Sequence, residues 1–454
     1  MADKPEVDYM ALREAFTTDD HKISEARIAR HVIERVKLIS RHGVPYNVDG
    51  EMDRAMIVQA IANLLIELGV EYGNAHKAEA IMKLVIQLSA EENIEINRTA
   101  IPVANGTIVV DPKDGSYMFT PIKQFSPYRL SCNFEANAND LTWFNRWLEV
   151  LYEDDHDCFQ EIMGYLLLPV TFGQYAFFLI GEGGCGKSVW GCILRAIFGN
   201  SMTSAETHAI ENDRFARATL ENKLLNYDDD LDGAKMTKTN VFKMLVTAKQ
   251  PIQGERKGVD RFEFTPFARL CGCGNSSLSS MFDLTDAFVR RLLLIKAKPP
   301  IEKSKIIPDI EERIYPEASA ILNWSLQGLK RLIQNNYQFS ISERSKALVQ
   351  NVREESNSII PFIADEIEFG AGFYVTSERL IMEYKTYCHK MDFIARDSKL
   401  IPGYFKDHAE QLKIRYVNKV PALRKRGFVG MKVKSDTTQK KPALDLNSIF
   451  TKEG

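Results

Sequence analysis

The chain has 454 residues, 45% of them apolar and 26% charged, which is typical of a globular protein with material for about three domains. This composition excludes a largely disordered, collagen-like or coiled-coil chain, and the longest apolar runs are far too short to span a bilayer. The net charge is −3, yet residues 371–454 carry 17 basic and 9 acidic side chains. That excess indicates a polyanion-binding module at the C-terminal end, with a solvated basic surface as the alternative.

The seven cysteines are scattered and odd in number, so their spacing favours neither a disulfide framework nor a metal site. Residues 1–5 lack the basic-then-apolar layout of a secretory signal. We therefore expect a reduced, cytoplasmic protein without a membrane partner.

Residues 1–137 are predicted to form a helical domain that includes a small β-meander. Apolar residues recur at helical spacing over 56–68 and again over 81–88. Between 101 and 120, two turn-forming sequences separate short apolar runs, as in an antiparallel meander. Another helix is expected from about 141 to 168.

Strands alternate with helices from about 175 to 295, and this pattern predicts an α/β domain with a parallel sheet over residues 138–340. A polar helical linker and a mixed module are expected over 341–435. Residues 436–454 are polar and predict a loose tail.

A glycine-rich motif follows the apolar run 175–180 and precedes a helical run at 189–198. Its sequence, Gly181-Glu-Gly-Gly-Cys-Gly-Lys187-Ser188, matches G-x-x-x-x-G-K-[ST], the phosphate-binding P-loop. Glycines let backbone N–H groups point at phosphates, lysine reaches phosphate oxygens, and the serine hydroxyl ligates Mg²⁺. The alternative is a glycine-rich turn that happens to end in Lys-Ser. The predicted nucleotide-binding residues are Gly181, Gly183, Gly184, Cys185, Gly186, Lys187, Ser188 and Val189.

Two further strand ends carry polar residues. Asp228, Asp229 and Asp230 end an apolar strand, where one carboxylate can hold the metal and its neighbour can act as base toward water. Three consecutive aspartates leave the register open, and an acidic loop is the alternative. Asn275 ends the strand 268–274 and could hydrogen-bond the attacking water or the γ-phosphate, although asparagine at a strand end is usually a turn residue.

Two basic features complete the pattern. Arg290 and Arg291 precede an apolar strand and could supply a guanidinium to the γ-phosphate of a neighbouring subunit, or be mere surface charge. Residues 253–264 look like a hairpin whose basic tip holds Arg256 and Lys257, although without further context an exposed turn is the favoured interpretation.

The order of these elements within about 110 residues resembles the superfamily 3 helicases, specifically the phage, plasmid and poxvirus-type primase–helicases. Weaker matches are Gly164–Leu167, Glu317–Leu329 and the stretch from Tyr384 to Gly430, which is similar to the family's winged-helix module. The resemblance covers roughly residues 139–433. It implies a P-loop NTPase core of AAA+-like fold and a C-terminal winged-helix domain.

The resemblance also implies roles. Lys187 and Ser188 would bind ATP and Mg²⁺, with Asp229 at the metal. Asp229 and Asp230 would be the Walker B pair, with Asp228 as the alternative register. Asn275 would be the polar sensor and Arg290, ahead of Arg291, the arginine finger acting in trans. Lys257, with Arg256 beside it, would grip single-stranded DNA at the hairpin tip.

The implied function is an ATP-dependent, homo-hexameric DNA helicase that translocates on single-stranded DNA and unwinds duplex in the replication of a phage, plasmid or other mobile element. Its partners would be single-stranded and forked DNA and a separate primase or polymerase, in a bacterial or viral-host cytoplasm. The basic stretch 413–441 would contact duplex or forked DNA, with solvated surface as the rival. An ATP-switched replication initiator or loader with little unwinding is the alternative, and a small-molecule kinase is disfavoured because nothing indicates a substrate lid.

The sequence departs from the family pattern at three points. Cys185 stands where asparagine is common, and Ala248–Gln250 replace the Gly-Asp that often precedes the hairpin. Upstream, no primase domain is recognisable, so we expect no priming activity. The role of residues 1–137 stays open between a collar, a docking domain and a DNA-binding domain.

Overall fold

The computed structural model describes residues 9–439, apart from positions 71–72, 232–238, 276–285, 356–357, 392, 394, 396–397, 399 and 422. The chain divides into two compact units, Met1–Val349 and Gln350–Gly454. The division falls inside helix α14 (Glu343–Glu355), the helical linker that the sequence predicts. Most of the predicted tail lies outside the described residues.

The first unit begins with a helical part that contains a small sheet. Its elements are α1 (Tyr9–Phe16), α2 (Glu25–Val36), β1 (Ile39–Arg41), β2 (Val44–Asn47), β3 (Gly50–Glu51), α3 (Arg54–Glu67) and α4 (Asn74–Leu88). The sheet β1-β2-β3 is antiparallel and was not expected from the helical periodicity around it. His42 and Gly43, with φ of 46° and 81°, form the tight turn between β1 and β2, and positive φ at both turn residues matches the twist of a hairpin.

The predicted meander over 101–120 is an antiparallel sheet of β4 (Ala100–Val103), β5 (Gly106–Val110) and β6 (Tyr117–Thr120). The single helix expected over 141–168 is instead two helices, α5 (Thr142–Leu151) and α6 (His156–Tyr165). Tyr152 is in an extended conformation between them, where the polar run 153–155 interrupts the apolar pattern.

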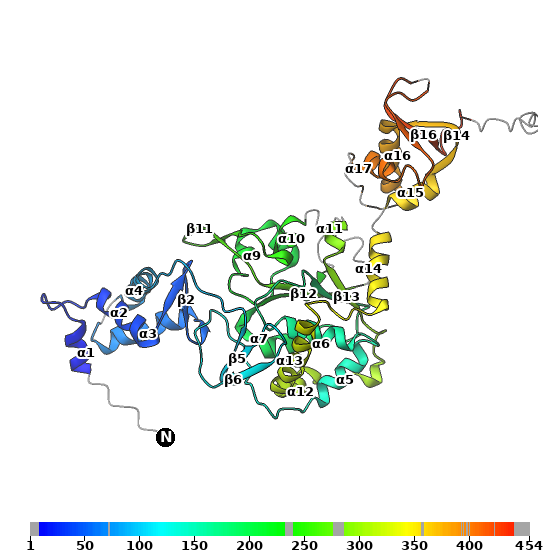
Figure 1. Ribbon diagram of the computed structural model, residues 1–454. Coiled ribbons are helices and arrows are strands. Elements are labelled where there is room, and N and C mark those ends of the chain that lie inside the picture. Colours follow the sequence, from blue (N-terminus) through cyan, green and yellow to red (C-terminus); the bar gives the residue numbers. More distant parts are fainter. Residues whose placement is uncertain are drawn as a thin grey trace, which may run out of the picture. The chain divides into compact units, whose positions relative to one another are not determined.

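A five-stranded parallel sheet forms the centre of the first unit, as the alternating pattern predicts (Figure 1). Its strands are β7 (Ala176–Ile180), β8 (Met202–Thr203), β9 (Leu225–Asp228), β12 (Arg269–Gly274) and β13 (Leu292–Lys296). They lie in the order β13-β7-β12-β9-β8, so β12 separates β7 from β9. Because all strands run in the same direction, the carboxyl ends of β7, β9 and β12 lie at the same edge of the sheet.

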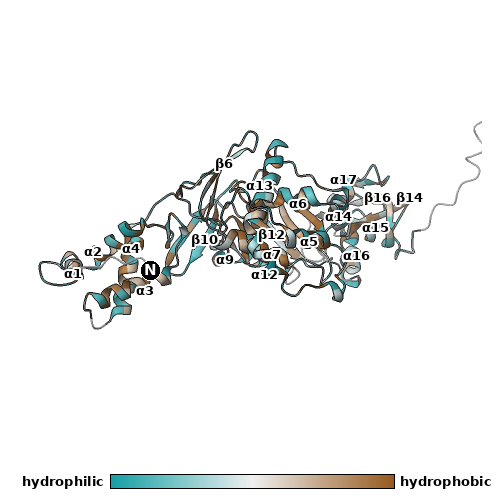
Figure 2. Ribbon diagram, turned by 90° about the horizontal axis from the view of Figure 1, so that it is seen from below, coloured by the Kyte–Doolittle hydropathy of each residue, from teal (hydrophilic) through white to brown (hydrophobic). Residues whose placement is uncertain are grey.

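Helices cover this sheet and bury its apolar residues. They are α7 (Val189–Phe198), α8 (Thr207–Asn212), α9 (Arg214–Ala218), α10 (Asn240–Thr247), α11 (Asp286–Val289), α12 (Ile310–Ile314) and α13 (Ala318–Gln334), together with α5 and α6. Figure 2 shows brown, apolar ribbon in α6, α7, α13 and the central strands, where the buried residues lie.

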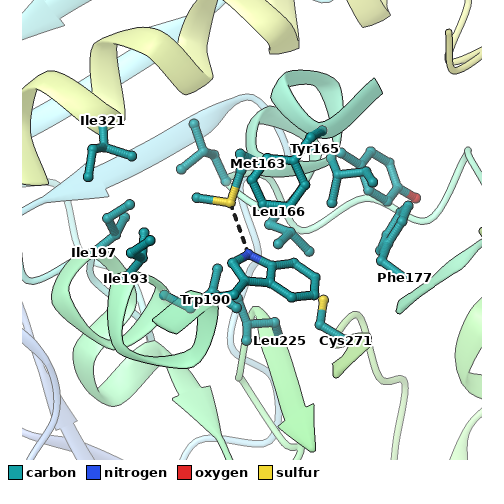
Figure 3. Packing of buried hydrophobic residues seen from close by; sticks show 14 of the residues in the cluster. Met163, Tyr165, Leu166, Phe177, Trp190, Ile193, Ile197, Leu225, Cys271 and Ile321 are labelled. Carbon is teal, nitrogen blue, oxygen red and sulfur yellow. Dashed lines mark hydrogen bonds between the residues drawn. The ribbon is translucent and has the colours of Figure 1, made fainter. Parts of the chain in front are cut away.

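Trp190 on α7 anchors that helix in the core (Figure 3). Its Nε1 donates to Met163 Sδ at 3.3 Å, and its ring lies among residues of β9 and β12. Nearby, α6 and α13 cross closely enough that a Cβ on Gly328 would lie 2.1 Å from Gln160 O. This contact explains the glycine in the matching stretch Glu317–Leu329.

The predicted hairpin is formed by β10 (Ile252–Arg256) and β11 (Val259–Phe264). The second unit contains, in chain order, α15 (Ile359–Glu366), β14 (Ile367–Thr376), α16 (Ser377–Lys390), α17 (Leu400–Asp407), β15 (Arg415–Val417) and β16 (Gly427–Val433). Its antiparallel sheet, in the order β14-β16-β15, shares a separate core with the helices, centred on Phe362, Tyr384 and Phe428. Within the part of the chain that the structure describes, no helix is both long and apolar enough to cross a bilayer.

Candidate functional site

The glycine-rich loop, residues 181–188, connects β7 to α7. Its carbonyl groups are held by the protein around it: Gly184 O accepts from Ile301 N at 3.1 Å, and Gly186 O accepts from Trp147 Nε1 at 2.8 Å. In a planar trans peptide, the C=O group of one residue and the N–H group of the next point in opposite directions. The N–H groups of Cys185 and Lys187 therefore face away from these contacts. Gly184 and Gly186 have φ of 82° and 83°, which glycine adopts without strain.

Lys187 lies back over this loop. Its Nζ donates to Gly181 O at 2.7 Å and to Glu182 O at 2.8 Å, and lies 3.5 Å from Cys185 Sγ. Cys185 is buried beneath the loop, whereas Ser188, at the start of α7, is exposed. A phosphate oxygen would be a stronger partner for the ammonium group than these neutral carbonyls.

The three aspartates after β9 have different surroundings. Asp228 is buried, and its Oδ2 accepts from Thr207 N at 2.6 Å at the start of α8. Its Oδ1 accepts from Asp230 N at 3.3 Å, so both carboxylate oxygens are occupied by backbone groups. Asp229 and Asp230 instead line a cavity next to the loop. Of the three aspartates, Asp228 therefore has a structural partner at each carboxylate oxygen, whereas Asp229 and Asp230 face the cavity.

A series of polar contacts through the buried side chains of Tyr227 and Cys273 leads from Asp229 to the loop. Tyr227 Oη donates to Asp229 Oδ1 at 3.0 Å and lies 3.0 Å from Cys273 Sγ, which itself lies 3.4 Å from Lys187 O. Burial raises the pKa of the Tyr227 hydroxyl and raises the pKa of the Cys273 thiol to about 12, so both groups keep their protons. The sequence did not indicate these contacts; the only signal was the alternation of Cys271 and Cys273, which fits core packing.

The cavity beside the loop has a volume of about 760 Å³. One half is polar, with Lys187, Ser188, Asp229, Asp230 and, at the end of β12, Asn275. The other half is built by α5, the start of α12 and the segment after β13, and it mixes apolar side chains with Arg146, Glu149, Ser304 and Lys305. Its apolar lining residues are Trp147, Val150, Ile301, Ile306, Ile307 and Ile310. The cavity thus offers both charged groups and apolar surface to a ligand.

The sequence did not predict this second half of the cavity. Its residues come from segments far from the motif in the chain, and apolar residues in a helix or loop carry no sign of a ligand. Among the described residues, no group of three or more His, Cys, Asp or Glu side chains is arranged to hold a metal ion.

Arg290 and Arg291 lie at the opposite end of the sheet from the loop. Leu292, which follows them, pairs with Ala176 at the start of β7, whereas the loop begins after Ile180. A strand of this length spans about 16 Å. Arg290 is exposed and does not line the cavity, so it does not reach the loop of its own chain.

The two basic residues of the hairpin have different surroundings. Lys257 is exposed at the tip, next to Gly258 with φ of 75°. Arg256 instead donates to Glu221 Oε2 at 2.7 Å, to Ala218 O at 2.9 Å and to His42 O at 3.2 Å. Arg256 is therefore engaged within the chain, unlike the DNA contact that the sequence predicts.

The second unit exposes basic side chains on the loop between β15 and β16, namely Lys419, Arg424, Lys425 and Arg426. Lys425 pairs with Glu378 at 2.7 Å, and both side chains are more than half exposed. An exposed pair of this kind contributes little stability, so it could yield to another anion.

Comparisons with known proteins are distant. A family of unknown function (DUF5906) matches residues 179–291, about a quarter of the chain, and no protein of curated function matches. Among solved structures, the apo C-terminal region of NrS-1 is 13% identical, with 89% of this chain and 99% of that one covered and a TM-score of 0.45. Another form of that region is 21% identical over 46% of this chain and 51% of that one, with a TM-score of 0.36.

SCCmec type IV Cch, described as an active helicase, is 13% identical over 85% of this chain and 89% of that one, with a TM-score of 0.39. All three TM-scores are below 0.5, so these likenesses by themselves establish neither the fold in detail nor the activity.

Proposed function

We propose that this chain is an ATP-dependent DNA helicase of the superfamily 3 type. The observation that carries the proposal is the shared cavity of Lys187, Ser188, Asp229, Asp230 and Asn275, which come from three strand ends. A glycine-rich turn that merely ended in Lys-Ser would have no reason to lie beside two carboxylates and an amide.

In this proposal the loop acts as a P-loop for the triphosphate of ATP. The N–H groups of the loop and the start of α7 face the phosphates, and Lys187 exchanges its two carbonyl partners for phosphate oxygens. Ser188 and Asp229 fit a Mg²⁺ ion, because both supply hard oxygen ligands to one cavity. The metal would neutralise charge on the phosphates. Asp230 takes the proton of the attacking water, and Asn275 orients that water.

Arg290 would act on the cavity of a neighbouring copy, because the length of a strand separates it from the cavity of its own chain. In a hexameric ring each ATP would then touch two chains. Loss of the γ-phosphate would remove a contact shared by both, so neighbouring chains would shift relative to each other.

DNA would be held by the hairpin tips, each presenting Lys257 to the phosphate backbone. Such binding is largely independent of base sequence and weakens with salt. The exposed basic loop of the second unit, which would be a winged helix, would contact the duplex or forked part of the DNA.

The test is ATP hydrolysis with increasing single-stranded DNA, together with strand displacement on a forked duplex. We expect DNA-stimulated hydrolysis and unwinding, both abolished in Lys187→Ala. Hydrolysis indifferent to DNA, without unwinding, would favour the ATP-switched initiator or loader.

A further inference from the structure

Glu221 is a buried carboxylate that joins three parts of the first unit. It lies in the turn between α9 and β9, with a side chain only 3% exposed. Its Oε2 accepts from Arg256, at the end of β10, at 2.7 Å. Its Oε1 lies 2.6 Å from His42 Nδ1 and 3.6 Å from Arg41 Nε, both at the turn between β1 and β2.

The same turn also contacts the hairpin directly. The ring of His42 stacks on Phe262 of β11, with ring centres 4.0 Å apart and planes at 20°. A Cβ on Gly43 would lie 2.9 Å from Val259 Cγ2, so the backbone of the turn presses against the residue that follows the hairpin tip. The Arg256 guanidinium covers the Phe262 ring at 4.8 Å.

We propose that the sheet β1-β2-β3 is a brace that sets the position of the β10–β11 hairpin for single-stranded DNA, with Glu221 and His42 as positioning residues. The proposal rests on the proposed function, in which the hairpin tip holds DNA. It assigns a task to part of residues 1–137, whose role the sequence leaves open.

The brace also connects the hairpin to the nucleotide cavity. Glu221 is followed within a few residues by β9, and β9 leads to Asp229 and Asp230 at the cavity. The Glu221–Arg256 ion pair ties the hairpin to the segment that leads into β9, a short strand that is buried along its whole length. The hairpin can therefore move little relative to the sheet. The hairpin therefore moves with the sheet of its chain, and stepping along DNA comes from movement between chains.

The direction in which one substitution changes the affinity for DNA distinguishes a positioning role from a simple effect of charge. Glu221→Gln removes a negative charge close to the hairpin, and by charge alone DNA binding should tighten. If Glu221 positions the hairpin, affinity for a fluorescent single-stranded oligonucleotide should instead fall by about five-fold or more. The matched control is Glu263→Gln, the same change at an exposed site of the same hairpin, for which affinity should stay equal or increase.

Glu221→Gln leaves the guanidinium groups of Arg41 and Arg256 around a neutral amide and could unfold the protein, so a second variant is needed. His42→Asn keeps the turn, because Asn-Gly is a preferred sequence at such turns, but loses the stack on Phe262 and the reach to Glu221. We expect weaker DNA binding in His42→Asn, with ATP affinity and hydrolysis without DNA unchanged.

Lys257→Ala distinguishes failure of the brace from failure of the proposed function. If Lys257→Ala weakens DNA binding but His42→Asn and folded Glu221→Gln bind as tightly as the wild type, the brace is wrong and the DNA-binding hairpin stands. If Lys257→Ala has no effect on DNA binding, the hairpin is not the DNA contact, and the brace is wrong together with that part of the proposed function.

Discussion

Tyr227 donates a hydrogen bond of 3.0 Å to Asp229, the carboxylate that we place at the metal. Because burial keeps this hydroxyl protonated, the bond fixes Asp229 as an acceptor in one orientation. Asp229 is thus oriented from within the core, through a residue two positions before it on β9.

Tyr227→Phe should lower the turnover number for ATP by about ten-fold while costing only about 1 kcal/mol of stability. The reason is that the ring still packs against α7 but no longer orients Asp229. Steady-state kinetics and chemical denaturation measure the two effects. Tyr165→Phe is the control: its hydroxyl accepts from Gly173 N outside the cavity, so it should lose similar stability but no turnover. Equal turnover in both variants would contradict the role of Tyr227.

The aspartates should separate in function. Asp229→Asn is expected to lower hydrolysis at least about a hundred-fold and to leave the unfolding midpoint nearly unchanged. Asp228→Asn should have the smaller effect on hydrolysis but lose about 1.5–3 kcal/mol of stability. The reason is that the Asp228 carboxylate accepts a hydrogen bond from the backbone N–H of Thr207. If Asp228→Asn is the inactive but stable variant, the register is shifted by one residue.

Substitutions of the two basic residues of the hairpin should affect different properties, DNA binding for Lys257 and stability for Arg256. Lys257→Ala should weaken binding to single-stranded DNA and reduce the salt slope by about 1, without loss of stability. Arg256→Ala leaves the buried Glu221 without its closest cation and should cost about 3 kcal/mol. Fluorescence anisotropy across salt concentrations and thermal unfolding would show both effects, and a stable Arg256→Ala with the larger salt effect would reverse the assignment.

Stability should fall at alkaline pH. Burial raises the pKa of the thiols of Cys132 and Cys273 to about 12, above their value in the unfolded chain. The folded state therefore holds these protons while the unfolded state releases them from about pH 9, and stability drops by about 1.4 kcal/mol per pH unit per thiol. Urea unfolding at pH 7.5 and pH 10 measures this slope. Cys132→Ala should reduce the slope by the share of one thiol, because burial also raises the pKa of other thiols such as those of Cys158 and Cys271, and an unchanged slope would contradict the contribution of Cys132.

Much of the fold and of the polar half of the cavity could be predicted because the relevant patterns are local. Gly181–Ser188 is a continuous motif, and Asp229 and Asn275 each end an apolar strand, whose parallel neighbours bring such ends together. The hairpin was visible as two runs around Lys257 and Gly258.

The rest depends on contacts between distant segments. Ile306 lines the cavity only because the chain passes the loop again after β13. The sequence around Glu221 does not distinguish it from other acidic residues, because its partners Arg41, His42 and Arg256 lie in distant segments. The sheet β1-β2-β3 is too short to interrupt the helical periodicity around it. Contacts between segments that are distant in the chain, rather than residue type, distinguish all of these positions.

The most direct test of the central claim, that ATP is hydrolysed between two chains under the control of DNA, is a mixing experiment with two variants. Lys187→Ala lacks the phosphate contact but keeps Arg290, and Arg290→Ala has the reverse defect. Each alone should be nearly inactive while assembling like the wild type by mass photometry. Mixed particles should recover DNA-stimulated hydrolysis, because an Arg290→Ala cavity can meet the arginine of a Lys187→Ala neighbour. Full turnover in Arg290→Ala alone, or no recovery in mixed particles, would contradict the claim.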